Sequence, residues 1–125
     1  MIKLKSLLNG SNITLYHATR VPSLIVKDGI KTSNAGVINK EGVKRVYASD
    51  KLSKAVNALQ YEDDLKTQMG IFRKTKGDIF IVKFTIPSVE VERKSNGDFT
   101  INRDIKPEEL ESILTKDGKI FQQLK

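Results

Sequence analysis

The run from Asp78 to Ile86 constrains the fold of this chain more than any other segment. Its apolar residues include the unbroken series Ile79, Phe80, Ile81 and Val82, followed by Phe84. In an extended segment these side chains occupy both faces, because successive side chains point in opposite directions. A strand that is apolar on both faces belongs in the centre of a sheet, with further elements packed on each side of it. We therefore expect layers built around this segment.

Two strands and a short helix are predicted before the central strand. Ile13 to Thr19 is rich in β-branched and aromatic residues, which favour a strand. Pro22 suits the first turn of a short helix, and Gly29 is well placed just after its end. Residues 31–45 contain turn-forming residues with little periodicity, so a loop is expected there. Arg45 to Ser49 predicts the second strand.

A helix is predicted after this second strand. Ser49 or Asp50 can cap it. One stripe at helical spacing should be buried, namely Leu52, Ala55, Val56 and Leu59. The opposite face offers to solvent or ligand the side chains of Lys51, Lys54, Asn57 and Tyr61. The charged segment from Glu62 to Lys76 lacks this period, and we expect an irregular flap or connection.

The remaining elements are predicted from alternation and turn residues. Val89 to Glu92 alternates apolar and acidic residues, as an edge strand with one solvated face does. Residues 95–97 predict a turn into a strand from Asp98 to Ile105. Pro107 is expected to begin a helix. Its inward-facing residues would be Leu110, Ile113 and Leu114. This order of elements predicts one α+β domain over residues 1–125, with mostly antiparallel strands and short helices.

Composition narrows the possible chemistry. The chain has no cysteine, which excludes disulfides, thiolate metal sites and a cysteine nucleophile, and its single histidine argues against zinc. No stretch approaches the ~20 apolar residues of a membrane span, and Met1 to Leu8 lacks the apolar core of a signal peptide. We expect a soluble protein without metal or membrane contact, in the cytoplasm of the producing or host cell.

The formal charge of +7 is unevenly distributed. Residues 1–54 carry ten basic against three acidic residues, whereas residues 55–125 carry twelve of each. A basic region attracts a phosphate-bearing ligand, a nucleic acid or an acidic protein by long-range steering. A solvated lysine-rich surface without such a partner is the simpler alternative.

Three segments resemble the ADP-ribosyltransferase superfamily, in particular the branch of poly(ADP-ribose) polymerases and diphtheria toxin. Leu15 to Ile30 (LYHATRVPSLIVKDGI) resembles the first signature of that branch, in which a histidine strand leads to a short helix ending in glycine. Val46 to Asn57 (VYASDKLSKAVN) resembles its tyrosine strand and following helix. The tail from Thr100 to Leu114 resembles a strand followed by a helix that begins at proline. The resemblance implies an ADP-ribosyltransferase-like domain with split sheets and NAD as co-substrate.

The resemblance also implies roles for the first motif residues. His17 matches the histidine that hydrogen-bonds the ribose of the adenosine half of NAD. The backbone of Ala18 matches the group that holds the nicotinamide carboxamide. Tyr47 matches the tyrosine that stacks on the nicotinamide ring. Thr19 and Ser49, in the same two motifs, are further candidate cofactor-binding residues.

The acidic residue of the family has no direct counterpart in this chain. The position in register with the family's glutamate is Phe99, whereas Asp98 lies one place earlier and serves only if a bulge or gap shifts the register. In an extended strand Asp98 shares a polar face with Thr100 and Asn102, opposite Phe99. The family's second aromatic is also missing at Ala58, and Tyr61 is the candidate substitute. Asp98, His17 and Tyr47 are therefore the predicted catalytic set.

These residue types suit glycosyl transfer, although each has a structural alternative. A fixed carboxylate stabilises the oxocarbenium-like state, a flat aromatic holds the leaving base, and an imidazole bonds a sugar hydroxyl. Without such a role, His17 would be a hydrogen-bonded core residue on the face of Ile13 and Leu15. Tyr47 would be a half-buried strand tyrosine, and Asp98 a turn residue.

Three functions are consistent with these observations. The first is a mono-ADP-ribosyltransferase that modifies a protein or nucleic acid, as a toxin or a phage-encoded modifier. The second is a catalytically inactive binding or inhibitory module with the same fold, suggested by the displaced glutamate. The third is RNA 2′-phosphotransferase chemistry, which is less favoured because that group resembles a larger, arginine-rich pattern with more than one histidine.

Overall fold

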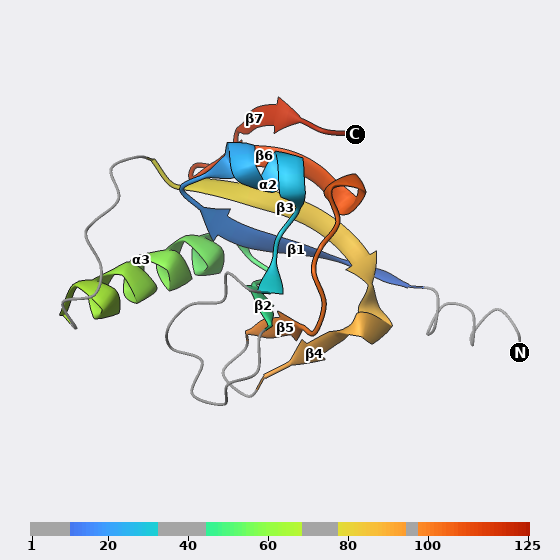
Figure 1. The fold of residues 1–125 in the computed structure, drawn as a ribbon, viewed down its shortest axis with the longest axis horizontal. Helices are drawn as coiled ribbons and strands as arrows, with labels where there is room; N and C mark the ends of the chain where they lie inside the picture. Colours follow the sequence, from blue (N-terminus) through green and yellow to red (C-terminus); the bar gives the residue numbers. More distant parts are fainter. Residues whose placement is uncertain (1–10, 33–44, 69–77, 95–97) are drawn as a thin grey trace, which may run out of the picture.

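The computed structural model describes residues 11–32, 45–68, 78–94 and 98–125. Four antiparallel strands form the larger sheet, here called sheet 1 (Figure 1). In spatial order they are β1 (Asn12–Thr19), β3 (Phe80–Pro87), β6 (Leu110–Thr115) and β7 (Ile120–Gln123). β3 is a central strand of sheet 1, as its apolar pattern predicted.

Three short antiparallel strands form a second sheet, here called sheet 2. They lie in the order β2 (Val46–Ala48), β5 (Phe99–Ile101) and β4 (Val91–Arg93). The two α-helices of the described ranges are α2 (Pro22–Asp28) and α3 (Leu52–Gln68), and the 3-10 turns are η2 (Ser88–Glu90) and η3 (Pro107–Glu109). The predicted α+β class with split, mostly antiparallel sheets is confirmed at this level. Neither α2 nor α3 combines the length and the apolar character needed to cross a bilayer.

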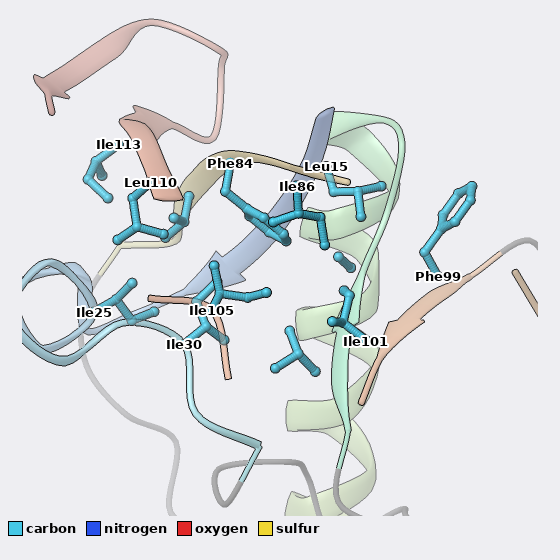
Figure 2. Close-up of a cluster of buried hydrophobic side chains, with 13 residues drawn as sticks. Leu15, Ile25, Ile30, Phe84, Ile86, Phe99, Ile101, Ile105, Leu110 and Ile113 are labelled. Carbon is cyan, nitrogen blue, oxygen red and sulfur yellow. The ribbon is translucent and has the colours of Figure 1, made fainter. Parts of the chain in front are cut away.

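The main core lies between sheet 1 and sheet 2, and α2 closes one side of it (Figure 2). Leu15 and Phe84 are fully buried on sheet 1, and Ile101 is fully buried on sheet 2. Ile25 of α2 and Ile105 complete the cluster. Burial of a side chain of this size stabilises a fold by about 1.5–3 kcal/mol, so this layer is the main source of stability.

A second, smaller core lies on the other face of sheet 1. Ile79 and Ile81 of the central segment pack there with Leu114 and with Ala55 of α3. The predicted helical stripe is confirmed, because Leu52, Val56 and Leu59 also pack against this cluster. The expected irregular segment is wrong for residues 62–68, which continue α3. They include several good helix formers, which need no buried face to stay helical next to a packed helix. Residues 69–76 lie outside the described ranges.

The helix predicted from Pro107 is wrong. Pro107 begins only the single turn η3, and Leu110 to Thr115 then pairs with β3 as strand β6. The register shifts between Lys83 and Phe84, so that Glu111 is an extra residue in β6. This bulge places Leu110 and Ile113 on the same face, which produces a spacing of three in a strand. The strand β7, which pairs with β6, was not predicted.

Two predicted strands are shorter than expected. Of Val89 to Glu92, only residues 91 and 92 are in β4, because η2 precedes it, but β4 is an edge strand as predicted. Of Asp98 to Ile105, β5 contains residues 99–101, and Ile105 forms a separate bridge with Ile30. The predicted turn at 95–97 and most of the predicted loop at 31–45 lie outside the described ranges.

Arg103 lies two residues after the end of β5, and its guanidinium is held by groups outside sheet 2. It donates to both carboxylate oxygens of Glu109, at 2.7 and 2.8 Å, and it also bonds Glu90. The Arg103 side chain lowers the pKa of Glu109 below its usual value. Asp104 accepts the backbone N–H of Thr32 at 2.8 Å, and this bond lowers the pKa of Asp104. The segment between β5 and β6 is thus fixed from several directions.

Gly29 is a position where only glycine fits. Its φ is +77°, and a Cβ placed there would lie 2.0 Å from the carbonyl oxygen of Ile105. We expect Gly29→Ala to lower the free energy of unfolding by at least about 1–3 kcal/mol, because backbone strain and steric overlap add. Denaturant unfolding measures this, with the exposed Ser23→Ala in α2 as the matched control. A Gly29 variant as stable as the control would contradict the bridge between Ile30 and Ile105.

Acid should weaken the Arg103 interactions. A carboxyl whose pKa is lowered on folding stabilises the protein above its ordinary pKa, and this stability is lost as the pH falls through the folded value. We expect Arg103→Gln to be less stable than the native protein by about 1–2 kcal/mol at pH 7. This difference in the free energy of unfolding should shrink as the pH falls below 4.5, the usual pKa of a glutamate such as Glu109. Denaturant unfolding from pH 7 to pH 3, with Lys27→Gln as control, tests this, and a constant difference would contradict it.

Candidate functional site

One isolated bridge connects the edge of sheet 1 to sheet 2. The N–H of Tyr16 donates to the carbonyl of Ser49 at 2.8 Å, and the N–H of Ser49 donates to the carbonyl of Tyr16 at 3.0 Å. Among the described residues, β1 therefore has β3 on one side and, at the single bridge of Tyr16 with Ser49, the end of β2 on the other.

The imidazole of His17 separates the two strands beyond this bridge. In a continued antiparallel ladder the next bonded pair would be Ala18 with Tyr47. Instead, Nδ1 of His17 lies 2.7 Å from the carbonyl oxygen of Tyr47. We call the region between Ala18 and Tyr47, bounded by His17 and the bridge, the β1–β2 fork.

This contact defines the protonation of His17. A carbonyl oxygen only accepts a hydrogen bond, so Nδ1 carries a proton and donates it to Tyr47. In the neutral imidazole Nε2 then carries the lone pair and is a hydrogen-bond acceptor. The structure thus brings together two of the predicted site residues, 30 positions apart in sequence, through the backbone of Tyr47.

The backbone of Ala18 points into the fork. β1 pairs with β3 without a register shift from Asn12 to Thr19. Because both backbone groups of Tyr16 face Ser49, alternation directs the N–H and C=O of Ala18 to the same side, away from β3. Within the described ranges no backbone bond to these two groups is present beyond β1, so they form a donor and an acceptor at this strand edge.

The side chain of Tyr47 lies on the outer face of sheet 2. Its neighbours Val46 and Ala48 are buried in the main core, whereas Tyr47 is 40% exposed. Tyr47 pairs directly with Thr100 of β5. The polar face predicted for the strand at Asp98 is therefore the face of Tyr47, and Phe99 is buried in the core as expected.

Asp98 lies just before β5 on the same face by alternation. Its carbonyl accepts the N–H of Lys94 at 2.8 Å, which continues the pairing of β4 with β5. Asp98 is half-buried. It is diagonal to Tyr47 across the strands, and such neighbours are about 7–8 Å apart.

Neither Thr100 nor Glu92 was a predicted site residue, although the sequence placed Thr100 on the polar face of Asp98. Glu92 of β4 pairs with Thr100, so Tyr47, Thr100 and Glu92 form a row across sheet 2. The carboxylate of Glu92 lies 3.4 Å from Nζ of Lys94, and the buried hydroxyl of Thr100 has no hydrogen-bond partner among the residues that the structure describes. A hairpin closing at 95–97 already implies this register, since position 92 then faces position 100.

The side chains of the other candidate cofactor-binding residues do not line the fork. The hydroxyl of Thr19 is buried and accepts the N–H of Val21 at 3.0 Å, so it serves the turn after β1. Ser49 is buried and forms the bridge with its backbone. Tyr61 is 62% exposed on α3, about 14 Å along the helix axis from Leu52 by helical rise.

Two hollows on the described surface lie elsewhere. One is on the outer face of sheet 1, and the other is lined by charged residues around Arg103. Within the described ranges no group of three or more histidine, cysteine or acidic side chains is arranged to hold a metal ion.

No family model matches the chain, no curated protein matches its sequence, and no solved structure matches its fold.

The single histidine makes the protonation of the fork directly measurable. We expect neutral His17 to carry its proton on Nδ1, because this nitrogen donates to the carbonyl of Tyr47. A long-range ¹H–¹⁵N NMR spectrum at a pH where the ring is neutral distinguishes the two tautomers without assignment ambiguity. A proton on Nε2 would contradict the contact that separates β1 from β2.

Proposed function

We propose that the chain is an ADP-ribosyltransferase-like domain that binds NAD at the β1–β2 fork and transfers ADP-ribose to a macromolecular acceptor. One observation carries the proposal. Nδ1 of His17 donates a hydrogen bond to the carbonyl of Tyr47. The N–H and C=O of Ala18, which a continued ladder would pair with Tyr47, are therefore directed into the fork.

A primary carboxamide is complementary to this edge. Nicotinamide offers an N–H donor and a carbonyl acceptor side by side, as a neighbouring strand does. The C=O and N–H of Ala18 would bind these two groups, and the nearby Tyr47 ring would stack on the heterocycle. Nε2 of His17 would accept a hydrogen bond from a ribose hydroxyl of the adenosine half.

The outer face of sheet 2 supplies the charge that the reaction needs. The bond between C1′ of the ribose and the nicotinamide nitrogen breaks, and nicotinamide leaves with the electron pair. An oxygen or nitrogen of the acceptor bonds to C1′ and releases its proton. A fixed carboxylate stabilises the cationic sugar between these events, and Asp98 is the proposed residue because it shares the face of Tyr47.

The arrangement of elements supports the proposal in part. A histidine strand, a tyrosine strand followed by a helix, and a late strand beside Asp98 occur in the order that the superfamily implies. The C-terminal segment departs from it, because β6 stands where a helix was expected. Tyr61 is also distant from α3's first turn, so the ring would be stacked on one side by Tyr47 alone.

The acceptor would be acidic. Lys51 and Lys54 are exposed at the beginning of α3, which follows directly from β2. They belong to the basic region 1–54 and would attract a nucleic acid or an acidic protein toward the fork.

A second function is favoured by Thr100. The residue directly across from Tyr47 is this uncharged side chain, and the carboxylates of Asp98 and Glu92 lie to its sides. A domain of this kind could bind NAD or ADP-ribose without breaking the glycosidic bond, and it would then act as a binding or inhibitory module.

Incubation with adenylate-labelled NAD and a cell lysate tests both functions. We expect free nicotinamide and a labelled macromolecule, and Asp98→Asn should slow nicotinamide release by about 10²–10³-fold. Asp117→Asn, in the exposed turn before β7, is the control for loss of a carboxylate. Calorimetry with NAD completes the test. Binding without turnover would favour the module, and no binding would contradict both functions.

A further inference from the structure

The outer face of sheet 1 has a hollow of about 400 Å³ beside the part that α3 covers. It lies on the opposite face of β1 from the main core and does not include His17 or Tyr47. We propose that this hollow binds a free α-amino acid with an apolar side chain. The inference is independent of the function proposed for the fork.

One end of the hollow is apolar. Leu114 of β6 pairs with Ile120 of β7, and Leu52 at the start of α3 completes this wall. The turn between the two strands keeps the end open, because Gly118 has no side chain to fill it. Ile120 is 65% exposed, so an apolar group of a ligand would cover surface that now faces water.

The other end is charged. Lys83 of the central strand pairs with Ser112, and Ser112 pairs with Gln123. Nζ of Lys83 lies 3.8 Å from Oε2 of Glu111. Both side chains are about one-third exposed, so both charges can be reached from solvent.

Two bulges direct side chains into the hollow. The extra residue in β6 is Glu111, whose carboxylate is on the face of Lys83 rather than in the main core. A second shift, between Ile113 and Leu114, makes Phe121 the extra residue of β7. As a result Ile120 and Gln123 line the same hollow. Bulges that re-aim side chains are frequent next to binding sites.

Glu111 is held in place by hydroxyl groups beneath it. Thr85 donates to Oε1 of Glu111 at 2.5 Å, and the hydroxyls of Thr85 and Thr14 are 2.9 Å apart. Because the proton of Thr85 is used on Glu111, Thr14 donates to Thr85. This leaves Oε2 directed at Lys83 and the hollow. Because the Glu111 carboxylate is already held in place, it needs to move little when a ligand binds.

The spacing of the two ends selects the ligand. Lys83 and Ser112 lie two residues along their strands from Ile81 and Leu114, a distance of about 7 Å. An α-amino acid places an ammonium group on Glu111, a carboxylate on Lys83 and an apolar side chain on Leu114. A ligand with only one charged group would separate Lys83 from Glu111 and supply a new partner to only one of them. The volume is in the range of small-molecule sites.

NMR titration of the ¹⁵N-labelled full chain with L-leucine tests the proposal. We expect saturable shifts at Lys83, Ser112 and Gln123. Leucinamide lacks the carboxylate and 4-methylpentanoate lacks the ammonium group, so each should bind at least tenfold more weakly. Absence of saturable shifts, or equal binding of the three compounds, would overturn the proposal and indicate that Lys83 and Glu111 only join β3 to β6.

Variants give a second readout. Lys83→Met and Glu111→Gln should each weaken leucine binding at least tenfold while the amide spectrum stays that of a folded protein. Lys27→Met, on the exposed side of α2, removes a lysine elsewhere and should bind leucine as the native chain does. Unchanged binding by both hollow variants would also overturn the proposal.

Discussion

The contact between Nδ1 of His17 and the carbonyl of Tyr47 decides how the two sheets meet. A continued antiparallel ladder beyond Tyr16 and Ser49 would pair the backbone of Ala18 with that of Tyr47, and the imidazole holds the carbonyl of Tyr47 instead. The strands part after one bridge. The same side chain therefore lies where the sheets separate, and the N–H and C=O of Ala18 are directed away from β3 beside it. The candidate site exists because the imidazole of His17, and not the backbone N–H of Ala18, donates to the carbonyl of Tyr47.

The rest of the fold keeps this junction in position. β3 buries Val82, Phe84 and Ile86 in the main core, and it pairs with β1 along the whole length of β1. On the other side, Arg103 and the bridge between Ile30 and Ile105 fix the chain where it leaves β5. This matters because β5 carries Thr100 opposite Tyr47 and follows directly from Asp98. A shift of one residue in β5 would turn these polar side chains toward the core.

Sequence patterns predicted the elements whose causes are local. The strand at Ile13–Thr19, the helix from Pro22, the stripe of α3 and the central strand follow from propensity, turn residues and periodicity. The C-terminal helix was wrong because a bulge at Glu111 imitates helical spacing, and a bulge depends on the partner strand. The chain after Ile101 leaves sheet 2 and is held by the bonds of Arg103 to Glu90 and Glu109, which the local sequence pattern does not predict. For the site, the sequence motifs named His17 and Tyr47 as candidates, but the contact between them and the row through Thr100 to Glu92 depend on how the strands are placed and paired.

Amide hydrogen exchange at Ala18, with and without NAD, tests the central claim most directly. The N–H groups of His17 and Tyr16 are directed at β3 and Ser49, so they should exchange slowly. The N–H of Ala18 is directed into the fork, so it should exchange quickly in the free protein. Its exchange should become slower when NAD is bound. Slow exchange at Ala18 in the free protein, or fast exchange that NAD leaves unchanged, would contradict an open binding edge at the fork.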